Sequence, residues 1–400
     1  MDNLLSNIDT ILADNSDITS VLDEHEKYYL KNLISQYNNN LIELCERSDL
    51  LKESEVKLNL LNTIIHLIFK NSNSKEELIK NSFNNSDIKI TQLLATTFEL
   101  SKYIFDEKFK QNKLSDIRCL ENVTMLGLLS EKTVELDSLL QERLKYINQL
   151  DIDLEYKNIE EKLDFLTSKF FILLSSHIAT KKEVLFILNL ESELDLLLEE
   201  AQNKLIDSDE QFIEFGLKVS ASANIIYLLK EFFYYCRYGE FEDGNSFSSK
   251  LDTYIFNTIK IHEYLNDKEK VVKYTLLRFA LIELFNLSIW SLADKSPTIN
   301  KFIRSLTNEA SEEIIFNLLP SQKKATKDLF SAKKSVVVTM PTSAGKTLIG
   351  ELYILYKMHQ YNVDGYPTVC YIVPTNALVN QVQSEFKEKF KSFDFNIEIA

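Results

Sequence analysis

The sequence predicts a mostly α-helical N-terminal region followed by the start of an α/β domain with parallel strands. Proline is absent before Pro297, and only four glycines precede that residue. Because both residue types interrupt regular structure, their scarcity indicates helices joined by polar connections. Beyond residue 319, prolines and β-branched runs appear, and strand-like segments alternate with helical ones. This alternation is typical of a parallel sheet covered by helices.

Periodicity and helix-start signals support the helical part of this prediction. Apolar residues recur at spacings of three and four and form one stripe on a helix: Ile187, Leu190, Leu194, Leu197, Ala201 and Leu205. In a capping box, side chains three residues apart satisfy backbone N–H groups at a helix start. Three pairs fit this pattern: Thr180 with Glu183, Ser74 with Glu77, and Ser208 with Gln211.

Charge is unevenly divided along the chain. Residues 319–400 hold 10 Lys and Arg against 7 Asp and Glu, a net charge of +3, and the rest holds 35 against 53, a net charge of −18. An acidic surface repels a phosphate backbone, so the C-terminal part is the better candidate for contact with nucleic acid. We expect the acidic charge on solvated helix faces. The alternative is a docking surface for a basic protein partner.

These observations divide the chain into three parts. Residues 1–296 are expected to form an all-helical acidic accessory region, residues 297–318 a helical connector, and residues 319–400 the α/β segment. Within the first part, one run combines aromatic residues with an arginine: Phe232, Phe233, Tyr234, Tyr235, Arg237 and Tyr238. Such a run favours the core-facing end of a helix with a wet rim. The alternative is a surface that stacks on bases.

Composition argues against a secreted or membrane protein. The four cysteines are far apart and form no CxxC pair, which disfavours a disulfide framework or a zinc site and fits a reducing cytoplasm. No basic region followed by an apolar run begins the chain, so no signal peptide is expected. The most apolar long stretch, residues 274–293, contains Arg278 and Glu283, and a charge near a membrane centre costs about 2.5 to 3.5 kcal/mol. We expect a buried helix there, no membrane span and a cytoplasmic location.

The last 82 residues contain the elements of the α/β segment. Residues 336–339 and 368–373 are short apolar runs suited to buried parallel strands. Residues 348–359 have helical spacing, and apolar positions between residues 378 and 390 mark another amphipathic helix. The order strand, helix, strand, helix predicts a parallel sheet with covering helices.

A phosphate-binding loop is predicted between the first strand and its helix. Backbone N–H groups and the helix dipole can hold a phosphate at such a junction. Gly345 allows close backbone approach, Lys346 would reach the β- and γ-phosphates, and the Thr347 hydroxyl would coordinate Mg²⁺. We predict Lys346 and Thr347 as catalytic residues and Thr347 as the metal ligand. The predicted ATP-binding residues of the loop are Pro341, Thr342, Ser343, Ala344, Gly345, Lys346 and Thr347.

Residues 341–347 resemble motif I of superfamily 2 DEAD/DEAH-box-type helicases, in particular the Ski-like branch. The sequence departs from the strict phosphate-loop pattern at Met340, where that pattern has glycine. Two further segments match in order: Leu-Pro-Ser-Gln at residues 319–322 resembles the Q motif, and residues 373–381 resemble motif Ia. The resemblance covers residues 319–400 and implies a RecA-like fold there.

The resemblance also implies roles for individual residues. Gln322 would read adenine, because a carboxamide can donate to and accept from one base edge. Motif Ia lines the nucleic-acid path in the family, and the residues that match it are Pro374, Thr375 and Asn376. Family members often carry a basic residue where this chain has Asn376, which weakens a charge-based contact at that position.

An ATP-dependent helicase or translocase acting on DNA or RNA is therefore the expected function, with ATP and Mg²⁺ as cofactors. No Asp-Glu-x-His/Asp motif follows motif Ia up to Ala400, and no second RecA-like domain with its arginine finger is present. We therefore expect residues 319–400 to be the first part of the ATP-binding domain, and the 400-residue chain alone to hydrolyse ATP poorly.

Two other functions compete with this expectation. The chain could be an acidic helical interaction module with a non-hydrolysing nucleotide-binding segment, in bacterial genome defence or repair by analogy. A phosphate-loop kinase is the third hypothesis, and the order of Gln322, the loop and Pro374-Thr375 argues against it.

Overall fold

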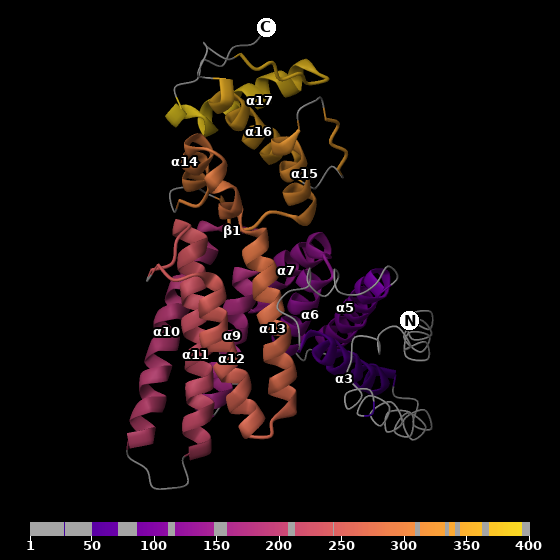
Figure 1. Cartoon of the computed structure of the whole chain (residues 1–400), viewed down its shortest axis with the longest axis vertical. Coiled ribbons are helices and arrows are strands. Elements are labelled where there is room, and N and C mark those ends of the chain that lie inside the picture. Colours follow the sequence, from indigo (N-terminus) through magenta and orange to yellow (C-terminus); the bar gives the residue numbers. More distant parts are fainter. Residues whose placement is uncertain are drawn as a thin grey trace.

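The computed structural model of the chain is helical over most of the residues that it describes (Figure 1). The described residues are 28, 50–70, 86–110, 117–147, 158–206, 213–242, 244–308, 313–332, 336–340, 345–361 and 368–393. The predicted capping boxes at Ser74 and Ser208 lie outside them.

The helices of the first region form one long bundle with a smaller group packed against it. In Figure 1, α10, α11, α12 and α13 run along the long axis, whereas α3, α5, α6 and α7 lie to one side. This side group contacts the bundle mainly through α6, which packs on α13 and α9, and through α3, which packs on α13. The helices are α3 (Leu50–Phe69), α5 (Ser86–Lys110), α6 (Ile117–Leu129), α7 (Thr133–Ile147), α9 (Ile159–Leu174), α10 (Lys181–Ile206), α11 (Ile213–Tyr238), α12 (Phe247–Tyr264) and α13 (Lys268–Leu287).

The remaining elements occupy one end of this bundle (Figure 1). They are η3 (Ile289–Lys295), α14 (Pro297–Leu306), α15 (Pro320–Ser331), α16 (Lys346–Tyr361), α17 (Asn376–Lys389) and η4 (Lys391–Phe393). Phe302 of α14 lies 5.7 Å from Phe390 between ring centroids, so the end of α17 packs on the connector. The C-terminal segment thus rests on the end of the helical region.

The helical predictions are confirmed where the structure describes the residues. Thr180 and Glu183 form the expected capping box, with the Thr180 N–H donating to Glu183 Oε2 at 2.7 Å and the Glu183 N–H donating to Thr180 Oγ1 at 3.3 Å. The stripe on α10 is buried at Ile187, Leu190 and Leu194. The apolar stretch predicted as one buried helix over residues 274–293 is a buried part of α13 up to Leu287, and it continues after Ser288 in η3. Among the described helices, none combines the length and apolarity needed to cross a membrane.

Two short strands, which the sequence analysis missed, join the connector to the helical region. β1 (Ile178–Thr180) pairs antiparallel with β2 (Glu313–Ile315), with Ala179 opposite Ile314. The prediction of a purely helical connector is therefore wrong over residues 313–315, where two adjacent β-branched isoleucines favour an extended strand. The partner strand lies more than 130 residues earlier, so local periodicity could not indicate the pairing.

Asn317 fixes the chain that follows β2. Its Nδ2 donates to the carbonyl oxygens of Leu174 and Ser176, at 3.3 Å each, and its backbone carbonyl oxygen accepts a hydrogen bond from His177 Nδ1. The N–H of Leu318 donates to the carbonyl of Leu287 at 2.7 Å. The residues that lead into α15 are thus held between the ends of α9 and α13.

The two predicted parallel strands are not confirmed. Residues 336–340 and 368–373 carry no strand pairing in the part of the chain that the structure describes. Val338 and Met340 pack against α15 and α16, but Val337 is 88% exposed and Ile372 is 87% exposed. A parallel strand needs hydrogen-bonding neighbours and cover on both faces. Here residues 336–340 have one side against helices and the other open, and residues 368–372 are exposed.

Gly239 ends α11 and allows the chain to turn beneath Trp290. Its φ is +79°, and a Cβ added there would lie 2.3 Å from Trp290 Cε3. Gly244 has a similar φ of +71°, but an added Cβ would meet nothing within 4 Å. A side chain at Gly244 would therefore cause backbone strain alone, whereas a side chain at Gly239 would cause the same strain and also overlap with Trp290.

We expect Gly239→Ala to destabilise the protein by about 2 to 4 kcal/mol, because it adds overpacking against the indole to the cost of left-handed backbone. Gly244→Ala should cost only the backbone part, about 1 to 2 kcal/mol. Urea denaturation of both variants measures the difference. Equal losses would show that the Trp290 contact does not constrain this turn.

Candidate nucleotide and nucleic-acid site

Gln322 lies in the first turn of α15, where its carboxamide joins two parts of the chain. Pro320 occupies the first helical position, which suits its fixed φ and missing N–H. The Leu319 N–H donates to Gln322 Oε1 at 2.8 Å, and Gln322 Nε2 donates to the carbonyl oxygen of Gly345 at 3.3 Å. The side chain is buried, with 1% of the residue exposed. Gln322 therefore tethers the start of α15 to the residue that precedes α16.

Gly345 has a local structural reason to be glycine. Its φ is +64°, and an added Cβ would lie 2.3 Å from Gln322 Nε2. A side chain would therefore break the contact with Gln322 and strain the backbone. This requirement is additional to the close phosphate approach that the sequence suggested.

Lys346 and Thr347 are the first two residues of α16, and both are exposed. Their side chains lie at the helix end where free backbone N–H groups and the helix dipole favour an anion. A lysine ammonium and a threonine hydroxyl there fit a phosphate and a hard divalent cation, respectively. The other predicted loop residues, Pro341, Thr342, Ser343 and Ala344, lie outside the described residues.

The predicted nucleic-acid residues form the exposed start of α17. Thr375 is the N-cap, and its hydroxyl oxygen accepts a hydrogen bond from the Leu378 N–H at 3.4 Å. Pro374 and Asn376 flank it, and all three residues are exposed. A helix start that is open to solvent can offer N–H groups to a backbone phosphate. The three residues thus lie together at one accessible helix end.

An ion pair between an exposed lysine and a buried glutamate joins the helix after the predicted phosphate loop to the helix after motif Ia. Lys389 Nζ of α17 lies 2.7 Å from Glu351 Oε1 of α16, and Glu351 is fully buried. Glu351 Oε2 has no hydrogen-bond partner among the described residues. Burial raises the pKa of Glu351, and Lys389 opposes that rise. Sequence analysis missed this pair because a glutamate within a helix ordinarily faces solvent.

We expect Lys389→Met to destabilise the protein by about 2 kcal/mol at neutral pH, because it leaves a buried carboxylate without its cation. Lys387→Met is the matched control, since Lys387 is an exposed lysine of the same helix that has no buried carboxylate partner among the described residues. Chemical denaturation of the two variants should show a loss only for Lys389→Met.

The pH dependence of this loss has a defined sign. Because the pKa of Glu351 is raised in the folded state, its protonation favours folding, and that stability is lost as pH rises through the folded pKa. The penalty of Lys389→Met should therefore shrink as the solution is acidified toward the ordinary pKa of a glutamate carboxyl, about 4.3. A penalty that stays constant with pH would contradict the assignment to Glu351.

The similarity to known proteins lies in the same part of the chain as the candidate site. Residues 319–400 match the family model of the DEAD/DEAH box helicases. The match begins at the cap of α15 and includes Gln322, the start of α16 and the start of α17. The match concerns these residues alone.

Two curated relatives show the same similarity. The chain is 33% identical over 98 residues to ATP-dependent DNA helicase Hel308 of Methanococcus vannielii, and 34% identical over 90 residues to ATP-dependent DNA helicase Hel308 of Methanocaldococcus jannaschii. The aligned residues are 24% and 22% of this chain, and they span only 12% and 7% of the two relatives.

Proposed function

We propose that this chain belongs to an ATP-dependent helicase or translocase of the Ski-like branch of superfamily 2, which acts on DNA or RNA. One observation carries the proposal: Gln322 contacts Gly345 directly before Lys346 and Thr347, within a segment that matches DEAD/DEAH box helicases. A single nucleotide can reach both an adenine-reading residue and a phosphate-binding helix start only when the two lie near each other.

In this proposal each residue of the site acts on one part of ATP. Lys346 binds the β- and γ-phosphates, and the Thr347 hydroxyl holds Mg²⁺, which neutralises phosphate charge when bound. Gln322 keeps one N–H and one lone pair beyond its two internal contacts, and these can read adenine once the buried carboxamide becomes accessible to the base. Gly345 has no side chain, so the backbone can approach the phosphates closely. Pro341 to Ala344 complete the loop.

The exposed start of α17 supports a path for nucleic acid. Thr375 and its neighbours Pro374 and Asn376 would contact a backbone phosphate, mostly through helix N–H groups, because Asn376 carries no charge. The pair Glu351–Lys389 connects this helix to α16. Movement of α16 on nucleotide binding would thus be transmitted to the nucleic-acid contact.

The acidic helical region acts as an accessory region in a cytoplasmic protein. Its repulsion of phosphate directs nucleic acid toward the C-terminal segment. Its solvated faces offer a surface for a basic protein partner.

ATP turnover by the full-length protein, with and without single-stranded DNA or RNA, tests the proposed function. We expect nucleic acid to stimulate turnover, because strand binding at α17 is coupled to the nucleotide site. ATP turnover that no nucleic acid changes would favour a phosphotransferase or an unrelated ATPase.

A further inference from the structure

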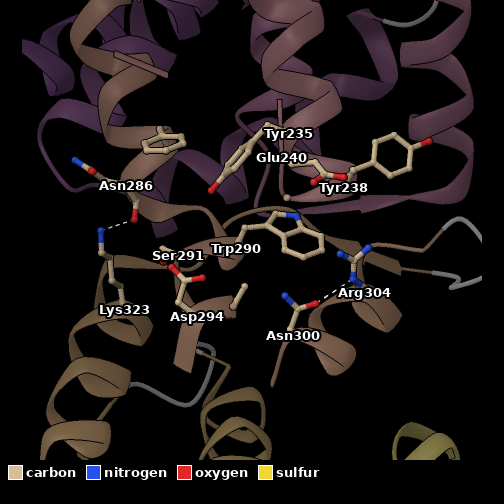
Figure 2. A pocket seen from close by; sticks show the side chains of 13 residues that line it. Tyr235, Tyr238, Glu240, Asn286, Trp290, Ser291, Asp294, Asn300, Arg304 and Lys323 are labelled. Carbon is tan, nitrogen blue, oxygen red and sulfur yellow. Dashed lines mark hydrogen bonds between the residues drawn. The ribbon is translucent and has the colours of Figure 1, made fainter. Parts of the chain in front are cut away.

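A pocket of about 430 Å³ lies where the helical region meets the C-terminal segment (Figure 2). Its walls come from the ends of α11 and α13, from η3, and from α14 and α15. Lys323, which directly follows Gln322, lines it from α15. Its size falls in the range of about 300 to 1,000 Å³ that is usual for ligand sites. A ligand here would touch both parts of the protein.

The lining suits a flat ring with polar edges. Tyr238, at the end of the aromatic run noted in the sequence, is 39% exposed, and Trp290 forms the centre of the wall in Figure 2. Arg304 lies 5.7 Å from the Trp290 ring centroid. Such aromatic and guanidinium groups stack on nucleobases. The earlier expectation of a buried core with a wet rim also holds, because Phe232 and Phe233 are buried.

Donors and acceptors around these rings match the edge of a base. Figure 2 places Arg304 and Lys323 on opposite sides of Trp290, with the Asp294 carboxylate between Trp290 and Lys323. Carboxylates accept from the exocyclic amino groups of bases, and amides and cations bond their ring nitrogens and carbonyls. Asp294 and Glu240 disfavour a phosphate inside the pocket. The chemistry therefore favours a base whose phosphates stay outside.

Basic residues close in sequence to the pocket lining can hold those phosphates. Residues 295–304 contain three basic and no acidic residues, within a region that is otherwise strongly acidic. Their basic side chains, Lys295, Lys301 and Arg304, are exposed, as are Lys324 and Lys327 of α15. Lysine and arginine residues of this kind bind a nucleic-acid backbone without reading its sequence.

We propose that this pocket accepts one base of a single-stranded nucleic acid, whose backbone lies along the basic residues of α14 and α15. The inference rests on the proposed function only in taking nucleic acid as the ligand, and it does not require ATP. The bound base would contact both the helical region and α15, the helix that carries Gln322.

Trp290 provides a direct readout, because it is the only tryptophan of the chain. A base entering the pocket should quench its fluorescence, whereas phosphate contacts on the surface should not. We would titrate the protein with a single-stranded oligonucleotide, with the same strand made abasic, and with free nucleosides. Strand binding is followed separately by the anisotropy of a fluorescent label.

Two exposed side chains are suited to substitution. Tyr238→Ala removes the most accessible aromatic wall, and Arg304→Gln removes a cation near Trp290. Lys260→Gln is the matched control, because Lys260 is an exposed cation 4.4 Å from the ring centroid of Phe256 on α12, outside the pocket. Circular dichroism and thermal melting verify that each variant is folded.

Saturable quenching by the base-bearing strand, little quenching by the abasic strand, and roughly tenfold weaker half-saturation in both pocket variants would support the proposal. Lys260→Gln should behave as the wild type. Strand binding without quenching, and unaffected by either pocket variant, would overturn it while leaving the proposed function intact. Quenching by nucleosides without strand binding would overturn it in favour of a small-molecule site, and no strand binding at all would count against the proposed function as well.

Discussion

Replacing Lys346 by Ala is expected to reduce nucleic-acid-stimulated ATP turnover of the full-length protein by at least about 100-fold. Lys346 is exposed at the first position of α16, so its removal leaves the fold intact and deletes one cation. Fixed positive groups that face a transferring phosphate contribute most when the charge develops, and loss of one such donor costs about 10²- to 10³-fold. Steady-state turnover at saturating nucleic acid measures this loss.

Lys357→Ala is the appropriate control for Lys346→Ala. Lys357 lies on the same helix, three turns away, where its Nζ donates to Gln360 Oε1 at 3.1 Å. Its loss should leave turnover within about twofold of the wild type, since a solvated surface contact contributes little. Similar losses of turnover in both variants would point to helix destabilisation. Unchanged turnover in Lys346→Ala would contradict the assignment of Lys346 to the nucleotide site.

Replacing Lys273 by Met should destabilise the helical region by about 3 to 5 kcal/mol. Lys273 Nζ of α13 lies 2.9 Å from Glu121 Oε2 of α6 and 2.9 Å from Asp164 Oδ1 of α9. The side chains of Glu121 and Asp164 are only 3% and 13% exposed. Removing the shared cation would leave two buried carboxylates poorly compensated, although Lys270 still lies 2.5 Å from Asp164.

Lys230→Met tests whether burial is the cause. Lys230 forms an ion pair of comparable length with Asp195, 2.6 Å, but the Asp195 side chain is 53% exposed. Solvated pairs contribute about 0 to 1 kcal/mol, so this variant should be nearly neutral. Urea denaturation of both proteins, at equal ionic strength, provides the comparison. Comparable losses would refute the special role of the buried cluster.

Acid should weaken the same cluster. Burial alone would raise the pKa of Asp164, but Lys273 and Lys270 outweigh it and hold that pKa well below its usual range. A carboxyl group with a lowered folded pKa contributes stability that is present above its unfolded pKa, about 3.9, and is lost as pH falls through the folded value. The difference between wild type and Lys273→Met should therefore narrow below about pH 4.

Local sequence signals predicted the helices well where a physical cause lay within one element. The Thr180–Glu183 capping box and the α10 stripe depend on residues three or four apart, and the structure confirms both. The burial of α13 followed from its apolar residues in the same way. Nothing local indicated β1 and β2, because each is only three residues long and the hydrogen bonds join distant positions.

Charged residues set a second limit on sequence-based prediction. Acidic side chains were expected on solvated helix faces, yet Glu121 and Glu351 are buried against lysines from other helices. Each pairing depends on helix packing and not on spacing, so the spacing of charged residues along the sequence cannot reveal it. The order of Gln322, Gly345 and Thr375 did indicate a shared site, but not that both ends of the Gln322 carboxamide bond to the chain itself.

Equilibrium binding of ATP to residues 1–400, with and without Mg²⁺, tests the central claim most directly, because it does not depend on turnover. We predict saturable binding that Mg²⁺ strengthens and that Lys346→Ala weakens at least about 100-fold, while Lys357→Ala binds as the wild type. Binding of equal strength in the wild type and in folded Lys346→Ala would contradict the claim that the start of α16 is the nucleotide site.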